Sequence, residues 1–280
     1  MARSSIIIVA GPTASGKSAR ALKLARKVKG EIVSADSRQV YRGLDIGTAK
    51  PSKKEQRSIP HHCIDLISPK RALTVIEYQK SALRAIKKIL AKGKTPIIVG
   101  GTGFYIDAVL YDSSFPEVPP NQKLRNQLGS STSESLFAML KKLDPARAKN
   151  IDAKNPRRLV RAIEIAKALG RVPALTKTPR FAARIILLNP SKTMLQKNIA
   201  RRTTHMLRAG LLDEVRKLVR TRIPRARILE LGFEYKHPLL YLEHQISKDE
   251  MIARINTENL RYAKRQMTWF KKTFAKEYRE

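Results

Sequence analysis

The chain has very little cysteine and no long apolar stretch. Cys63 is the single cysteine among 280 residues, which excludes an internal disulfide and a cysteine-based zinc knuckle. No apolar run reaches the roughly 18 residues that a membrane span needs, and no charged and then apolar leader precedes the first expected strand. We therefore expect a cytoplasmic protein that is not exported and does not contact a membrane.

Acidic residues are also scarce. The chain has 57 Lys and Arg but only 23 Asp and Glu, which gives a formal net charge of +34. A small phosphorylated metabolite does not require so much positive charge, whereas a polyanion such as nucleic acid does. A shell of solvating lysines remains the alternative on charge alone. With 42% hydrophobic residues the chain can bury a sizeable core.

The first motif is the apolar run IIIVA at residues 6–10, which leads directly into GPTASGKS. Apolar residues at helical spacing follow it, so the pattern predicts a strand, a phosphate-binding loop and a helix. Lys17 would reach the outer phosphates, and the Ser18 hydroxyl suits a Mg²⁺ ligand. The diphosphate- or nucleotide-binding residues are Gly11, Pro12, Thr13, Ala14, Ser15, Gly16, Lys17 and Ser18. A di- or triphosphate is therefore the expected ligand.

Residues 31–35 predict a second short strand, which ends at Asp36. Ligands of open parallel sheets lie beyond the carboxyl ends of the strands, so Asp36 should share a crevice with the phosphate loop. Its carboxylate could bind Mg²⁺ or accept a proton. The alternative is that Asp36 or Ser37 caps the N-terminus of a helix.

Residues 95–99 predict a further buried strand, followed by Gly100, Gly101 and Thr102. In common phosphate-loop hydrolases a strand like this ends in an Asp that holds Mg²⁺, and its replacement here argues against an ATP-driven motor. The two glycines would let a ligand approach the backbone closely, and Thr102 offers a hydroxyl.

The chain changes character after residue 112. Pro116, Pro119 and Pro120 indicate a hinge, and residues 121–170 are helical in pattern and basic. Arg158 and Arg161 lie one turn apart on an expected helix that starts at Pro156, a spacing suited to phosphate contacts unless they are simply solvated. We therefore expect a phosphate-loop catalytic core at residues 1–112, a helical insertion lobe that contacts nucleic acid at 113–178, and a return to the core with basic helices at 179–280.

The last expected helix covers residues 248–278, and its expected apolar side consists of Ile252, Ile255, Leu260, Ala263, Met267 and Phe270. Tyr262, Trp269 and Phe274 interleave with its basic residues. Such aromatic residues either stack on nucleic acid bases or belong to the core. Together these segments predict an α/β fold, a P-loop NTPase-like parallel sheet flanked by helices, with a small α-helical insertion lobe.

Five motifs follow one another along the chain in the order of a known family: GPTASGKS at 11–18, SADSRQVY at 34–41, LDIGTAKP at 44–51, VGGTG at 99–103 and RYAKRQ at 261–266. Together they resemble the tRNA dimethylallyltransferase (tRNA isopentenyltransferase) family over nearly the whole chain. Two departures are ILELGFEYK at 228–236 in place of the usual A-I-G-Y-K-E, and Asn198 where arginine is common. These departures concern the contacts with the anticodon loop rather than the chemistry.

The resemblance implies transfer of a dimethylallyl group from dimethylallyl diphosphate to N6 of the adenosine 3′ of the tRNA anticodon, at position 37, with Mg²⁺ as cofactor at Ser18. Asp36 would act as the base, Lys17 and Arg202 would bind the diphosphate, and Thr102 would lie at the mouth of the reaction channel. The residues expected to contact the tRNA anticodon stem-loop are Asp36, Ser37, Arg38, Gln39, Thr102, Arg125, Arg157, Arg158, Leu159, Val160 and Arg161. A monomer is expected. The alternatives are a phosphate-loop kinase of a nucleotide or small metabolite, and a tRNA-binding protein without activity.

Overall fold

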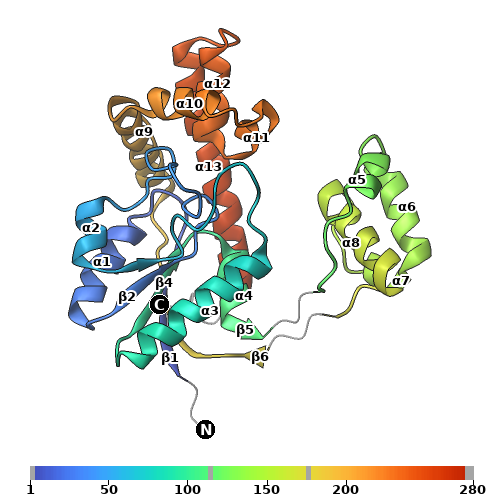
Figure 1. Ribbon diagram of the computed structural model, residues 1–280, viewed down its shortest axis with the longest axis horizontal. Helices are drawn as coiled ribbons and strands as arrows, with labels where there is room; N and C mark the ends of the chain where they lie inside the picture. Colours follow the sequence, from blue (N-terminus) through green and yellow to red (C-terminus); the bar gives the residue numbers. More distant parts are fainter. Residues whose placement is uncertain (1–3, 113–115, 175–177, 275–280) are drawn as a thin grey trace. The chain divides into compact units, whose positions relative to one another are not determined.

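The computed structural model describes residues 4–112, 116–174 and 178–274 (Figure 1). The chain divides into two compact units. The first joins the segment that ends at Tyr111 to the segment that starts at Pro179, and the second runs from Asp112 to Thr178. None of the described helices is both long enough and apolar enough to cross a bilayer.

The first unit is built on a five-stranded parallel sheet in the order β3-β2-β4-β1-β7. The strands are β1 (Ser5–Ala10), β2 (Glu31–Ser34), β3 (His61–His62), β4 (Pro96–Gly100) and β7 (Ala182–Leu187). β2 and β4 are buried along their whole length, as expected of parallel strands covered on both faces. The predicted α/β fold with a parallel sheet is confirmed.

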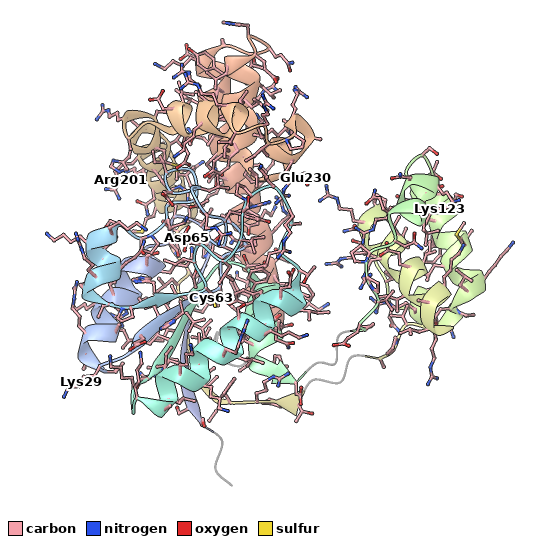
Figure 2. All side chains as sticks on the ribbon, in the orientation of Figure 1. Lys29, Cys63, Asp65, Lys123, Arg201 and Glu230 are labelled. Carbon is pink, nitrogen blue, oxygen red and sulfur yellow. The ribbon has the colours of Figure 1, made fainter. Side chains whose placement is uncertain are left out.

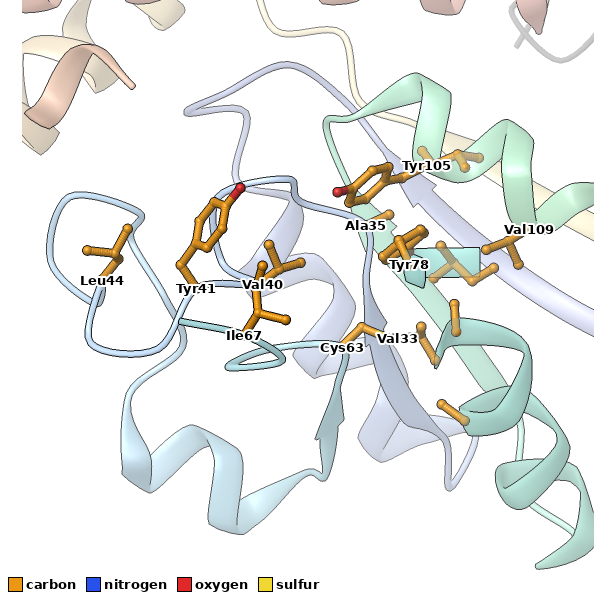
Figure 3. Packing of buried hydrophobic residues seen from close by; sticks show 14 of the residues in the cluster. Val33, Ala35, Val40, Tyr41, Leu44, Cys63, Ile67, Tyr78, Tyr105 and Val109 are labelled. Carbon is orange, nitrogen blue, oxygen red and sulfur yellow. The ribbon is translucent and has the colours of Figure 1, made fainter. Parts of the chain in front are cut away.

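Helices cover both faces of this sheet (Figure 1). They are α1 (Lys17–Lys27), α2 (Lys53–Ser58), α3 (Val75–Ala91) and α4 (Gly103–Leu110). Because side chains alternate along a strand, Ile6 and Ile8 of β1 join the core under α3 and α4, whereas Val9 joins the core under α1. In the larger core the rings of Tyr78 and Tyr105 stack at 3.8 Å (Figure 3). Strand β1 ends at Ala10, so the loop that follows it begins at the carboxyl ends of the strands.

A buried charged residue lies at the amino-terminal ends of the strands, opposite the end that carries the phosphate loop. Glu31, the first residue of β2, has no exposed side-chain surface, and its carboxylate contacts His62, Lys92 and Lys94 at 2.8, 3.1 and 2.9 Å. The two lysines follow α3 and reach back to the start of β2. This network stabilises the amino-terminal end of the sheet, away from the phosphate loop.

Five further helices complete the first unit. They are α9 (Lys192–Arg208), α10 (Leu211–Arg220), α11 (Arg225–Glu230), α12 (Phe233–Leu242) and α13 (Lys248–Thr273). The last predicted helix is therefore confirmed up to Thr273, and its expected residues 275–278 lie outside the described residues.

The predicted apolar side of α13 is wrong in part. The buried side consists of Met251, Ile255, Asn259, Ala263, Gln266 and Phe270, so two amides replace expected apolar residues. Trp269 is half-buried between Phe270 and Phe274, with ring centroids at 5.3 and 5.8 Å, and it lies against Gly103. Phe274 is only 1% exposed. Both aromatic residues therefore belong to the core and are not free to stack on bases.

The second unit is helical, as the sequence predicts. It contains α5 (Gln122–Leu128), α6 (Ser133–Leu143), α7 (Pro145–Ala148) and α8 (Pro156–Leu169) around a core that includes Leu124, Leu136, Leu140, Leu159 and Ile163. Asn155 accepts a hydrogen bond from the Arg158 N–H and so caps α8. The short strands β5 (Tyr111–Asp112) and β6 (Thr178–Pro179) form a separate two-stranded sheet where the chain passes between the units.

Candidate active site

The phosphate loop connects β1 to α1 at the carboxyl edge of the sheet. Gly16 has φ +83°, a conformation that glycine adopts without strain. A Cβ atom on Gly11 would lie 2.9 Å from the Ser15 Oγ and 3.1 Å from the Leu188 backbone, so only glycine fits there. The Lys17 ammonium donates a hydrogen bond of 3.2 Å to the Pro12 carbonyl and thus lies folded along the loop.

Loss of hydration lowers the pKa of Lys17 to about 8, against the attraction of the nearby Asp36 carboxylate. Arg202 adds to the lowering because it brings a second positive charge. Two cations and one carboxylate therefore share a confined space. Such an arrangement favours a ligand that carries more negative charge than Asp36 alone supplies.

Asp36 follows β2, and Thr102 follows the neighbouring strand β4. One carboxylate oxygen of Asp36, Oδ1, accepts hydrogen bonds from the backbone N–H groups of Arg38 (2.8 Å) and Gln39 (3.4 Å). Asp36 thus shapes a local turn, and no α-helix starts at it or at Ser37. Thr102 Oγ1 accepts a hydrogen bond of 3.1 Å from the Ser37 N–H. These bonds fix the ends of the two strands to each other.

Arg202 of α9 reaches the phosphate loop. Its guanidinium donates to Thr13 Oγ1, to Glu234 Oε1 at 3.0 Å and to Asn259 Oδ1 at 2.8 Å. The Asn259 amide in turn donates to Glu234 at 3.0 Å. Arg202 is therefore held in one orientation by α12 and α13, beside the loop that would bind the diphosphate.

Gln266 of α13 braces the phosphate loop from the other side. Its side-chain oxygen accepts a hydrogen bond of 2.8 Å from the Thr13 N–H, and its nitrogen donates at 2.8 Å to the Gly101 carbonyl. A Cβ atom on Gly101 would lie 2.3 Å from the Gln266 nitrogen, which explains the glycine. Sequence reasoning missed Gln266 and Asn259 as site residues, although the resemblance motif contains Gln266.

Glu214 of α10 holds the loop that contains the DIGTAKP motif. Its carboxylate accepts hydrogen bonds from three successive backbone N–H groups, those of Asp45 (2.8 Å), Ile46 (2.8 Å) and Gly47 (3.0 Å). It also accepts one of 2.7 Å from the Tyr235 hydroxyl. The sequence gives no local signal for this contact, because Glu214 lies more than 160 residues from the loop.

The same loop is fixed from within by Lys50. Its ammonium donates to Asp45 and Asp65 at 2.6 Å each and to the Tyr41 carbonyl at 2.9 Å. The Lys50 side chain is only 2% exposed. Asp65, labelled in Figure 2, comes from the segment after β3. The loop is thus braced both by Glu214 and by Lys50.

These contacts surround one cavity with about 670 Å³ of space, part of it open to solvent. It is lined by Thr13, Lys17, Asp36, Ser37, Arg38, Gly47, Thr48, Arg202, Gly232, Phe233, Glu234, Asn259, Tyr262 and Gln266. The structure therefore brings together the predicted residues Lys17, Asp36 and Arg202. Gly232 and Phe233 belong to the segment in which the sequence departs from the family pattern.

A smaller cavity behind the loop is lined by Ser18, Asp36 and Gln39 among others. No cluster of three or more His, Cys, Asp or Glu side chains suited to a metal occurs in the described residues. Mg²⁺ commonly keeps several waters and takes only one or two protein oxygens when it binds phosphates. The Ser18 hydroxyl with Asp36 close by is a donor set that fits such a phosphate-bound ion.

The predicted RNA-binding residues of the second unit differ in their exposure and in their contacts. Arg157 and Arg158 are exposed. Arg125 and Arg161 instead contact the fully buried Glu164 carboxylate at 2.6 and 3.0 Å, so they neutralise a charge inside the unit. Val160 is half-buried. The expected Leu159 contact is wrong for the side chain, which is 0% exposed and packs in the core.

A strand, phosphate loop and helix unit, with a carboxylate and an arginine that line the same cavity as the loop, defines a P-loop-fold enzyme that acts on a phosphorylated substrate. A family model described as IPP transferase matches residues 39–273. The chain is 40% identical to the tRNA dimethylallyltransferase of Exiguobacterium sp. over 98% of this chain and 89% of that protein. The chain belongs to the IPP transferase family, the tRNA dimethylallyltransferases.

Further relatives agree with this assignment. The tRNA dimethylallyltransferase of Pelotomaculum thermopropionicum is 38% identical over 95% of this chain and 88% of that protein. The crystal structure of a tRNA isopentenylpyrophosphate transferase from Staphylococcus epidermidis superposes with a TM-score of 0.69 at 32% identity, covering 96% of this chain and 90% of that one. A eukaryotic dimethylallyltransferase crystallised while acting on tRNA gives a TM-score of 0.84 at 27% identity, covering 98% and 72%.

Proposed function

We propose that this protein transfers the dimethylallyl group of dimethylallyl diphosphate to N6 of the adenosine at position 37, next to the tRNA anticodon, and releases diphosphate. The observation that carries the proposal is that Lys17, Arg202 and Asp36 line the same cavity. The two cations suit a diphosphate, and the carboxylate suits an amine that must lose a proton. Family membership supports the same reaction.

The diphosphate would bind between the phosphate loop and Arg202. The bond that breaks joins a carbon to a phosphate oxygen, so negative charge gathers on the leaving diphosphate. Lys17 and Arg202 would stabilise that charge in the transition state. Because Glu234 and Asn259 already hold the guanidinium in place, little reorganisation is needed as the charge develops.

Asp36 would accept the proton of the adenine amine. This amine is a poor nucleophile, because its lone pair is delocalised into the purine ring. The hydrogen bonds of the described residues use Oδ1 of Asp36, which leaves Oδ2 for the incoming N6 group. The turn through Ser37, Arg38 and Gln39, tied to Thr102, would form the wall against the adenosine.

Mg²⁺ would be held by Ser18 together with phosphate oxygens. When bound, the ion adds positive charge next to the leaving diphosphate. We propose that the active species is a monomer.

The RNA substrate would meet a strongly basic protein. The formal charge of +34 and the exposed Arg157 and Arg158 support contacts with the phosphate backbone of the anticodon stem-loop. The target adenosine must leave the anticodon stack to reach Asp36, at a cost of a few kcal/mol that these contacts would offset.

The decisive experiment combines an unmodified anticodon stem-loop with labelled dimethylallyl diphosphate, followed by nucleoside analysis. Wild-type protein should yield N6-dimethylallyladenosine. Asp36→Asn should bind both substrates nearly normally and lose about 100-fold or more in turnover, the scale of a general base. Asp249→Asn, an exposed carboxylate on the first turn of α13, is the matched control. Wild-type turnover in Asp36→Asn would remove Asp36 from the mechanism, and a product phosphorylated from ATP would indicate the kinase instead.

A further inference from the structure

The sheet is only partly covered on the face that α1 occupies. Ala21, Leu22 and Ala25 of α1 pack over β1, β4 and β2. The edge strand β7 continues that face beyond the helix, with Arg184 paired to Ile7 and Ile186 paired to Val9. A groove therefore runs between α1 and the edge strand, with about 1370 Å³ of space that is partly open to solvent.

The groove has an apolar floor and a cationic rim. Half-buried side chains of Ile7, Leu24, Val28 and Ile186 form the floor. The rim consists of the exposed residues Arg20, Lys23, Arg26, Lys27 and Arg184. No acidic residue lines the groove, and within the described part of the chain none of these five side chains makes an ion pair or hydrogen bond. The groove is thus a concentrated, uncompensated positive surface.

This surface is separate from the cavity at the phosphate loop. α1 starts at the carboxyl edge of the sheet and runs back toward the amino-terminal ends of the strands. Lys27 ends the helix, about 15 Å along its axis from Lys17 at a rise of ~1.5 Å per residue. Lys29, labelled in Figure 2, lies just beyond that end. A ligand that fills the groove must extend well away from the reacting groups.

We propose that this groove binds the ribose-phosphate backbone of the tRNA outside its anticodon stem-loop. Cations placed one helical turn apart suit successive phosphates, and an apolar floor suits the face of a ribose or a base. A concave groove fits a strand of RNA better than it fits a membrane surface, which is flat. This inference rests on the proposed function, because it takes tRNA as the substrate.

The test compares full-length tRNA with the isolated anticodon stem-loop. The groove variant carries Lys23→Glu, Lys27→Glu and Arg184→Glu. The control variant carries Lys80→Glu, Lys87→Glu and Lys88→Glu on the exposed side of α3, which changes the net charge equally. Binding is measured by titration at several salt concentrations, and turnover is measured with each RNA.

The groove variant should bind full-length tRNA at least 10-fold more weakly than the control variant does. The plot of log affinity against log salt concentration should become less steep, its slope decreasing in magnitude by about two, because three phosphate contacts are lost at roughly 0.7 each. Its kcat/KM on the anticodon stem-loop should equal that of the control variant within about twofold.

Three results would overturn the groove. These are equal weakening by both variants, equal weakening toward both RNAs, and binding of anionic vesicles that the groove variant loses while its affinity for full-length tRNA stays equal to that of the wild type. A glutamine version of the three groove substitutions serves if the glutamate version unfolds. Failure of the proposed function is distinguishable, because wild-type protein would then leave the stem-loop unprenylated while full-length tRNA binding is still measured.

Discussion

Glu214 gives the sharpest prediction about how the active-site wall is held. Glu214→Ala removes the acceptor of three backbone N–H groups and of the Tyr235 hydroxyl. Water can reach the exposed Asp45, but Gly47 and Tyr235 are buried, so two donors lose their partner without replacement. At about 1–3 kcal/mol for each of the two unsatisfied buried donors, the variant should lose about 2–6 kcal/mol of unfolding free energy.

Glu214→Ala should lower catalytic activity as well as stability, because Gly47 and Thr48 of the loop that Glu214 holds line the cavity. We expect kcat/KM to fall about 10-fold or more. Urea unfolding and steady-state kinetics measure the two effects. Tyr235→Phe removes one of the four hydrogen bonds and should cost about 1 kcal/mol.

Glu250→Ala, which removes an exposed glutamate paired with Arg254, is the control and should change stability by less than about 0.5 kcal/mol. Wild-type stability and wild-type kinetics in Glu214→Ala would show that other contacts hold the loop.

Three further predictions concern charge and burial. Since burial lowers the pKa of Lys17 to about 8, kcat/KM for dimethylallyl diphosphate should fall as pH rises through 8, where the ammonium loses its proton. Lys17→Arg should remove this decrease. A flat wild-type profile from about pH 7 to 9 would contradict the prediction. Burial raises the pKa of Glu31, but hydrogen bonds from Lys94, His62 and Lys92 outweigh it and bring the pKa to about 2. The ionised Glu31 should therefore add about 2 kcal/mol to the unfolding free energy after solvent screening. This contribution is present above pH 4.5 and is lost as pH falls toward 2. In urea titrations, Glu31→Gln should not show this loss of stability between pH 4.5 and 2. Leu159→Ala should destabilise the second unit by about 2–5 kcal/mol in thermal or urea unfolding. The double variant Arg157→Glu and Arg158→Glu should keep its stability and bind the stem-loop more weakly. Weaker stem-loop binding by a stable Leu159→Ala variant would restore Leu159 as an RNA contact.

Local patterns in the sequence predict the fold well. The apolar run before the phosphate loop, the short strands at residues 31–35 and 95–99 and the helical stretch from residue 121 all appear in the structure. Each of these patterns arises within a few residues of chain. Asp36 and Lys17 follow from the same logic, because parallel strands end at one edge of the sheet.

The rest of the site depends on contacts between distant residues. Glu214, Glu234, Asn259 and Gln266 act through partners far away in the chain. In α13 the two amides occupy buried positions, so the apolar pattern points to Ile252, Leu260 and Met267 instead. No local rule tells a buried amide in a helix from an exposed one.

Leu159 shows a second limit of sequence reasoning. It stands next to Arg158 in the chain, and both were expected to contact RNA. One residue along a helix turns the side chain by about 100°, however, so the neighbour of an exposed arginine can point into the core. The structure places Arg158 outside and Leu159 inside.

The hydrogen bond between Thr13 and Gln266 joins residues 253 positions apart. A ribosome completes the phosphate loop early, but the amide that braces it is made only after every described strand of the sheet. A nascent chain that lacks α13 can assemble β1, β2 and β4, yet its Thr13 N–H and Arg202 still have no amide partner. The phosphate loop is therefore among the first segments to leave the ribosome, yet it gains this brace only once α13 has been made.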